Sequence, residues 1–488
     1  MKILAIDLGT TGCKVGIFDP ERLTLIEEAY REYPLIVISS KEIEQDATLW
    51  WDLVKTLIKE VIKNARIEPK EIRALGISSQ GISFVPVDRG FNPIYNAISW
   101  LDTRAIIETK TIEEKFSFTE IFKKTGKRLN PAYVLPKFIW LKKNRPDIYD
   151  KAYKFLMGED FIIAKLTGIP VTDHSMASGT LLYDIERQDW CMELLETFGI
   201  PIEKLPSLSW GGEVIGYIRN DITQELNLES DTLVILGGQD QKCGVFGAGL
   251  IKEDSTVSIS FGTAIAVSRV IGTPILDPLM RIPCFSYLIP HQYILEGVIG
   301  TGGSSLNWLK DIFSIESFND MMEEGKKSKD KFNKLFFFPH LAGATSPYWK
   351  EELPGTFYGI TLSTTKSDII WSVIEGLAFQ VKKNIEVIEE LSGEVEDLVL
   401  FGGGAKGKLI REIFVNVLAK PLFVFPYPDM PLIGVSLLAG IVTGIFRDYK
   451  EIIPLIRKKA SLIEPEIRKI EIYGELYMEY LEIQSKLL

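Results

Sequence analysis

The chain has 488 residues, 46% of them apolar and 25% charged, with a formal net charge of −11 and a pI near 5.2. This composition is typical of a folded globular protein without long disordered segments. The length exceeds what one core usually supports, so we predict two domains of roughly 200 to 250 residues each. Because no dense block of Lys and Arg occurs, the sequence argues against a surface that binds nucleic acid or anionic membrane.

The cysteines and the apolar segments indicate a cytoplasmic protein. The four cysteines lack the paired spacing of a disulfide framework or a zinc site, which favours free thiols in a reducing compartment. The chain starts on an apolar segment with no signal-peptide pattern. The longest apolar run, residues 432–446, is too short to cross a bilayer and predicts a buried helix.

Residues 2–18 predict a strand, a turn rich in Gly and Thr, and a second strand. The turn contains Asp7, Thr10 and Thr11, and Lys14 follows it. Backbone N–H groups and hydroxyls in such a turn are suited to holding polyphosphate, and Asp7 could hold Mg²⁺ directly or through water. The alternative is an ordinary turn in which Asp7 is a local hydrogen-bond acceptor.

The next segments alternate between helix and strand, which predicts an α/β fold. Apolar residues recur at helical spacing over residues 46–64, and residues 72–87 are extended. Polar and aromatic residues suited to a sugar pocket follow these segments, namely Gln80, Trp100, Asp102 and Arg104. The alternatives are that Trp100 is a core residue and that Asp102 and Arg104 pair with each other.

Residues 237–241 have the sequence Gly-Gly-Gln-Asp-Gln. Phosphoryl transfer needs a carboxylate that accepts the proton of the attacking hydroxyl, and we predict Asp240 for this role. Gln241 could hydrogen-bond a sugar hydroxyl. The alternative, compatible with the first, is that Asp240 caps the helix that follows.

The second half repeats the pattern of the first. Residues 255–270 predict a strand pair with Gly262 and Thr263 at the tip, residues 367–391 a long amphipathic helix, and residues 397–401 a strand. A glycine-rich break at residues 402–405 precedes a helix over 408–418. We therefore expect a duplicated α/β unit with a hinge near residues 240–249, and an exposed loop or helix end at 323–333.

Other catalytic classes find little support. The only histidines are His174, His291 and His340, which we expect to be structural. The sequence therefore offers few residues for a His-based triad or metal site. The sequence contains no P-loop consensus and no catalytic-loop motif of protein kinases.

Together these segments resemble the FGGY carbohydrate kinases over residues 2–446. Residues 355–360, 368–369 and 372–375 resemble the whole second signature of that family. The first signature is matched only in its later half, residues 137–144, because Val134 stands where the family has a small residue. This resemblance is to a branch of the superfamily that also contains Hsp70 and actin.

The resemblance implies two RNase H-like domains, one at 1–243 that mainly binds the sugar and one at 244–488 that mainly binds the nucleotide, with a central cleft for ATP and sugar. It implies MgATP as the phosphoryl donor, Asp240 as the base, and Asp7 and Asp240 as the metal-binding carboxylates. The sugar positions are Gln80, Gly81, Trp100, Asp102, Arg104, Asp240 and Gln241. The nucleotide positions are Thr10, Thr11, Lys14, Gly262, Thr263, Gly302, Gly303, Gly402, Gly403, Gly404, Ala405 and Asn416.

The sequence indicates the acceptor sugar less directly, because family members that accept different sugars share the residues that bind phosphate. The Asp240-Gln241 pair is similar to that of glycerol kinases. However, Gly81 and Ile82 stand where those enzymes have an Arg-Glu pair, which disfavours glycerol. The Met-His pair of xylulokinases and gluconokinases is also absent there. Residues 172–184 are similar to xylulokinase-like members, so we predict a ketose such as xylulose. Gluconate or another sugar acid, fuculose or a polyol stay open.

Two other classes of protein are alternatives to an active kinase. An ATP-gated switch of the Hsp70 or actin type predicts an additional domain or an assembly surface, whereas the kinase resemblance takes up nearly the whole chain. An inactive kinase predicts a missing carboxylate, whereas Asp7 and Asp240 are both present. The expected partners are the sugar and MgATP, with a homodimer by analogy to the family.

Overall fold

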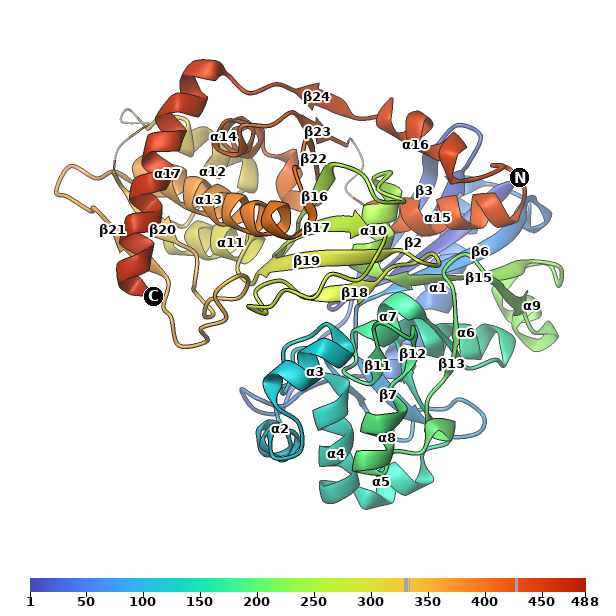
Figure 1. Ribbon diagram of the computed structural model, residues 1–488. Coiled ribbons are helices and arrows are strands. Elements are labelled where there is room, and N and C mark those ends of the chain that lie inside the picture. The colour runs from blue at the N-terminus through green and yellow to red at the C-terminus, as the bar shows by residue number, and fades with distance from the viewer. Residues whose placement is uncertain (329–331, 333, 426–428) are drawn as a thin grey trace.

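The computed structural model describes residues 1–328, 332, 334–425 and 429–488. Each half of the chain forms one large mixed sheet (Figure 1). In the first half the strand order is β14 (Val214–Tyr217), β15 (Leu233–Gln239), β6 (Ile72–Ser79), β1 (Lys2–Leu8), β2 (Gly12–Asp19) and β3 (Thr24–Glu32). In the second half it is β18 (Cys284–Ser286), β19 (Tyr293–Ile299), β17 (Ile265–Ile271), β16 (Thr256–Phe261), β22 (Asp397–Phe401), β23 (Leu422–Val424) and β24 (Ser461–Ile463).

The two large sheets share one arrangement of five strands. β1 pairs antiparallel with β2, which pairs antiparallel with β3, and β1 runs parallel to β6, which runs parallel to β15. In the same way β16 pairs antiparallel with β17, which pairs antiparallel with β19, and β16 runs parallel to β22, which runs parallel to β23. The predicted duplication of an α/β unit is confirmed by this shared strand order.

Most elements predicted from periodicity are present. The helix predicted at 46–64 is α1 (Ala47–Ala65), which begins at Asp46 because this side chain accepts hydrogen bonds from the first backbone N–H groups. The long helix is α13 (Lys366–Ser392), the strand at 397–401 is β22, and the helix after it is α14 (Lys408–Leu418). Local signals therefore sufficed for these elements.

The extended stretch at 72–87 is not one strand. β6 ends at Ser79, and β7 (Phe84–Val87) belongs to a separate five-stranded sheet. Between them Ile82 has a positive φ of 52°, which turns the chain. The order in this sheet is β4 (Ile36–Val37), β5 (Ile43–Gln45), β8 (Ala97–Ile98), β7 and β9 (Lys154–Met157).

Two helices connect the halves. α10 (Asp240–Gly247) follows β15 directly and occupies the predicted hinge, and α15 (Met430–Val442) is the buried helix predicted at 432–446. α15 packs on α10 and also on β1, β6 and β15, so a helix of the second half covers the sheet of the first (Figure 1). The helices touch at backbone level, since a Cβ on Gly434 would lie 1.9 Å from the carbonyl oxygen of Cys243.

The other helices surround these sheets. In the first half they are α2 (Ile106–Glu113), α3 (Phe118–Thr125), α4 (Val134–Asn144), α5 (Pro146–Lys151), α6 (Gly158–Thr167), α7 (His174–Ser178), α8 (Met192–Phe198) and α9 (Asn220–Leu226). In the second half they are α11 (Gly303–Ile312), α12 (Phe318–Gly325), α16 (Tyr449–Arg457) and α17 (Ile467–Leu487). Of the loop predicted at 323–333, residues 329–331 and 333 lie outside the described residues. Among the helices of the described ranges, none has the length and apolar character needed to span a membrane.

Candidate active site

Two carboxylates lie at the same edge of the first sheet. Asp7 is near the end of β1, and Asp240 directly follows β15 as the first residue of α10. Since β1, β6 and β15 are parallel neighbours, their carboxyl ends meet, and the register places Asp7 opposite Ser78 and Gln239 opposite Ser79. The sheet thus brings two carboxylates to one edge although they lie 233 positions apart in the sequence.

Burial raises the proton affinity of both carboxylates. It raises the pKa of Asp240 to about 7, and the charge of Asp7 adds to this rise. Burial also raises the pKa of Asp7 to about 6, although the Ser78 hydroxyl, which donates to Asp7 Oδ1 at 2.6 Å, and the charge of Lys14 oppose it. A carboxylate with a pKa near neutrality is suited to act as a general base.

Lys14, a predicted phosphate ligand, lies beside this pair. Its ammonium forms an ion pair with Asp429, the residue before α15, which lies 415 positions away in the sequence. The same ammonium lies 5.7 Å from the centre of the Tyr30 ring. Sequence reasoning missed Asp429, because no local signal connects it to the hairpin.

Gln80, a predicted sugar-binding residue, directly follows β6 and is held by several hydrogen bonds. It is 1% exposed, and its backbone N–H donates to the Leu8 carbonyl at 2.7 Å. Its side-chain amide donates to Gln45 Oε1 at 3.1 Å and accepts from the Ser83 hydroxyl at 3.1 Å. These bonds fix Gln80 but use much of its hydrogen-bonding capacity.

Trp100 is not a core residue, because 39% of it is exposed. Its indole N–H donates to Thr10 Oγ1 at 2.9 Å, which joins the predicted sugar wall to the phosphate hairpin. Thr10 is also held by Gln45, whose amide donates to the Thr10 carbonyl at 2.6 Å. Thr11 is exposed at the tip. The predicted sugar and phosphate residues are thus in contact at this point.

Asp102 and Arg104 form the ion pair that the sequence left open. Arg104 donates to Asp102 at 2.9 Å and to Glu44 at 2.9 Å, and its side chain is 3% exposed. Asp102 is fully buried and also accepts the backbone N–H of Ile43 at 2.7 Å. Because their polar atoms are used inside the domain, we assign the two residues a structural role in place of the predicted sugar contact.

The three glycine-rich breaks of the second half meet around the tip of the hairpin formed by β16 and β17. The backbone N–H groups of Gly303 and Ser304 donate to the carbonyls of Gly262 and Thr263 at 2.9 and 3.1 Å. Gly302 thus caps α11, and Gly303 and Ser304 begin the helix against this tip. Gly262 and Thr263 themselves are exposed.

The third break packs on the strand before the tip. A Cβ on Gly402, whose φ is +93°, would lie 2.7 Å from the Phe261 carbonyl oxygen, and one on Gly404 would lie 2.4 Å from the Phe261 ring. Only glycine permits this approach. Gly403 is exposed and has no atom near its Cβ position, so the backbone there is open to a flat ligand.

Asn416, which was predicted to border the adenosine, forms hydrogen bonds within the fold. It is 2% exposed, its amide donates to the Glu412 carbonyl at 2.7 Å, and its carbonyl oxygen accepts the backbone N–H of Glu466 at 2.8 Å. The residue therefore fixes the start of α17. Ala405 is 3% exposed, and its carbonyl accepts a hydrogen bond from Arg411.

Two further side chains close to Asp240 were not predicted. Lys242 forms a fully buried ion pair with Glu296 at 2.9 Å, and its charge opposes the rise in the pKa of Asp240. Gln239 lies over Gly81, where an added Cβ would approach the Gln239 amide nitrogen to 2.4 Å. The Gly-Gly-Gln-Asp-Gln motif contained Gln239, but only the fold shows that it faces Gly81.

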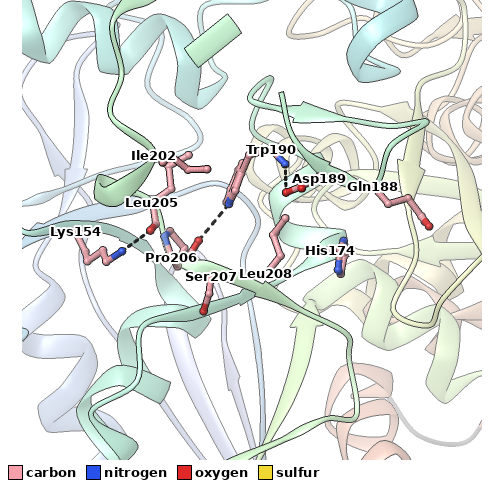
Figure 2. Close-up of a pocket in the computed structure, with 10 residues that line it drawn as sticks. All are labelled: Lys154, His174, Gln188, Asp189, Trp190, Ile202, Leu205, Pro206, Ser207 and Leu208. Carbon is pink, nitrogen blue, oxygen red and sulfur yellow. Dashed lines mark hydrogen bonds between the residues drawn. The ribbon is translucent and has the colours of Figure 1, made fainter. Parts of the chain in front are cut away.

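A cavity of about 550 Å³ is lined by other residues of the first half, among them Lys154, Trp190 and Leu205 (Figure 2). None of the predicted site residues lines it. Hydrogen bonds between the lining residues hold its wall. Lys154 donates to the Leu205 carbonyl at 2.7 Å, and the Trp190 indole donates to the Pro206 carbonyl at 3.2 Å. His174 lines it as well and stacks on Trp210 at 3.7 Å, in agreement with the structural role expected for that histidine.

Comparison with known families identifies the fold and the class of site. The model of the N-terminal domain of the FGGY family of carbohydrate kinases matches residues 2–247, and that of its C-terminal domain matches residues 257–442. The chain belongs to the FGGY family of carbohydrate kinases.

Individual relatives match over nearly the whole chain. A xylulose kinase from Staphylococcus epidermidis is 29% identical and covers 98% of this chain and 95% of its own. A glycerol kinase from Thermococcus gammatolerans is also 29% identical and covers 92% of this chain and 91% of its own. The crystal structure of a xylulose kinase from Lactobacillus acidophilus has a TM-score of 0.91 and 26% identity and covers 100% of this chain and 98% of its own.

Proposed function

We propose that the protein transfers the γ-phosphoryl group of MgATP to a hydroxyl of a small ketose such as xylulose, with Asp240 as the general base. The observation that best supports the base is its position next to Asp7 at the carboxyl edge of three parallel strands, with a pKa near neutrality. Asp240 would accept the hydroxyl proton at one of its carboxylate oxygens as the phosphoryl group is transferred.

The nucleotide would be held by backbone groups. Gly262 and Thr263 are exposed at their hairpin tip, Gly302 and Gly303 begin a helix beside it, and Gly403 leaves open backbone for the adenosine. Helix N-termini and successive N–H groups bind phosphate without requiring net positive charge. Thr10 and Thr11 would approach the phosphates from the first hairpin.

Mg²⁺ fits the carboxylate pair as part of the MgATP substrate. The described residues contain no group of three His, Cys, Asp or Glu side chains that could hold a metal by themselves. Mg²⁺ is commonly held by one or two carboxylates together with substrate phosphates, and Asp7 and Asp240 supply two carboxylates at the same edge of the sheet. When bound, the ion would neutralise charge on the transferring phosphoryl group.

A polyol such as glycerol is the second candidate acceptor. The glycerol kinase relative and Gln241 favour it. The Arg-Glu pair that glycerol kinases place after the first-domain strand is replaced by Gly81 and Ile82, which removes both charges. The similarity of residues 172–184 to xylulokinase-like members and the xylulose kinase relatives favour the ketose.

The proposal includes the division into a sugar domain at 1–243 and a nucleotide domain at 244–488, and a cytoplasmic location. The four cysteines support the location, since Cys13, Cys191, Cys243 and Cys284 are all buried free thiols. A homodimer is the expected assembly, which sedimentation would test.

The direct test is ADP release from MgATP with D-xylulose, L-xylulose, ribulose, fuculose, gluconate, glycerol and erythritol as acceptors. We expect the strongest response with one of the ketoses. If ADP is released at the same slow rate with every acceptor and without any, the assignment as a sugar kinase is wrong.

Replacing Asp240 by Asn tests the base. We expect kcat to fall by about 10²-fold or more, because the amide cannot accept the proton. The melting temperature should not fall. The matched control is Asp231→Asn, which alters an exposed ion pair with Arg73 away from the site and should leave kcat unchanged. Near-normal turnover of the Asp240→Asn variant would reject the assignment.

A further inference from the structure

Two glutamines flank Asp240, and both carry an unsatisfied acceptor. Gln239 ends β15, and Gln241 is the second residue of α10. The side-chain Oε1 atoms of both residues are buried and have no hydrogen-bond partner among the residues that the structure describes. A buried acceptor without a donor is unfavourable, so each gains when a donor reaches it. Gln80, by contrast, already bonds to Gln45 and Ser83.

Gly81 leaves the space that the Gln239 amide occupies. A Cβ at position 81 would lie 2.4 Å from Gln239 Nε2, 3.0 Å from its Cδ and 3.2 Å from its Cγ. Gly81 does not have a left-handed φ, so glycine is required here for space and not for backbone conformation. Any larger residue at position 81 would displace the amide of Gln239.

The charges around the two glutamines disfavour an anionic acceptor. Asp7 and Asp240 are adjacent carboxylates, and Asp429 lies beside Lys14. The nearby cations are already engaged, Lys14 with Asp429 and Lys242 with Glu296. A sugar carboxylate would meet this negative charge and the amide oxygens, whereas sugar hydroxyls would donate to them.

We propose that Gly81 and Gln239 act as a pair that selects neutral sugars, whose hydroxyls donate to Gln239 and Gln241, against sugar acids. This inference rests on the proposed function, because it assigns the acceptor class at the same site. Gln239 is thereby a specificity-determining residue in this chain, and Gly81 is its positioning partner.

A double-mutant cycle tests the pair. Isothermal titration calorimetry with and without ADP would measure the Kd of the neutral sugar that binds best among the ketoses and polyols, and of gluconate. We expect gluconate to bind at least about tenfold more weakly than that sugar. Gln239→Ala and Gly81→Ala should each weaken binding of the neutral sugar about tenfold, and the double variant should be no weaker than either alone.

The control is Gly474→Ala in α17, where an added Cβ meets no atom within 4 Å, and it should leave both Kd values unchanged. Gly81→Ala weakening binding by the same factor with and without Gln239 would overturn the pairing. Gluconate binding as tightly as the best neutral sugar, or no neutral sugar binding at all, would overturn the selectivity.

The two proposals fail in distinguishable ways. If a neutral sugar binds with the expected pattern of variants but no ADP is released, the kinase assignment fails and the selectivity stands. If gluconate is bound and phosphorylated in preference to neutral sugars, the kinase assignment stands and the selectivity fails.

Discussion

At the scale of single residues, the protonation of Asp240 governs the expected pH dependence. Burial, and then the charge of Asp7, raise its pKa to about 7. With both substrates well below their KM values, we expect the rate to fall about tenfold per pH unit below pH 7, because a protonated carboxyl cannot act as the base. A profile that stays flat from pH 5 to 8 would contradict this.

The same shift makes a prediction for stability. The carboxyl has a higher pKa folded than unfolded, so the folded state binds its proton more tightly and loses stability as the pH rises from about 4 to about 7. The Asp240→Asn variant lacks this loss. Its melting temperature should exceed that of the wild type at pH 8, and the difference should shrink as the pH is lowered to 4.

At this scale the sequence could predict those residues that belong to a local motif. Asp7, Asp240 and the glycine-rich breaks are recognisable because turn chemistry and phosphate binding leave short patterns. The ion pair of Lys14 with Asp429 and that of Arg104 with Glu44 join segments that only the fold brings together. The place of Asn416 at the start of α17 is likewise invisible locally.

At the scale of elements, hydrophobic periodicity and helix capping define the helices and strands, but they do not define which sheet each strand joins. α1 and α14 agree closely with prediction because their signals are local. The division of residues 72–87 between two sheets was missed, since strand partners are chosen by contacts distant in sequence. The turn contains Gly81, but its left-handed residue is the β-branched Ile82, which the sequence does not mark.

The contact between α10 and α15 gives a prediction for stability. In the Gly434→Ala variant the added methyl would lie 1.9 Å from the Cys243 carbonyl oxygen, so the helices must move apart. We expect the free energy of unfolding in urea to drop by about 1–3 kcal/mol, the usual range for overpacking. Gly474→Ala on the open face of α17 is the control and should not destabilise. Equal stability of the two variants would mean that the helices yield without strain.

At the scale of the whole molecule, the two halves share a strand order but do not form separate hydrophobic cores. α15 of the second half packs on the sheet of the first, where Ile3, Ala74 and Ile235 form a buried cluster with Ala439. Another core joins Ala5 and Phe18 to Leu432 and Val435. A duplicated architecture therefore does not imply two independent folding units.

This packing predicts how fragments behave. A fragment of residues 1–243 lacks α15 and exposes the apolar face of β1, β6 and β15, so it should aggregate or bind the dye ANS and melt without a cooperative transition. Co-expression with residues 244–488 restores the covering helix, and the two pieces should then co-purify and melt cooperatively. A monomeric, cooperatively melting 1–243 fragment that binds no ANS would show instead that the sheet tolerates losing α15 and that the first half folds on its own.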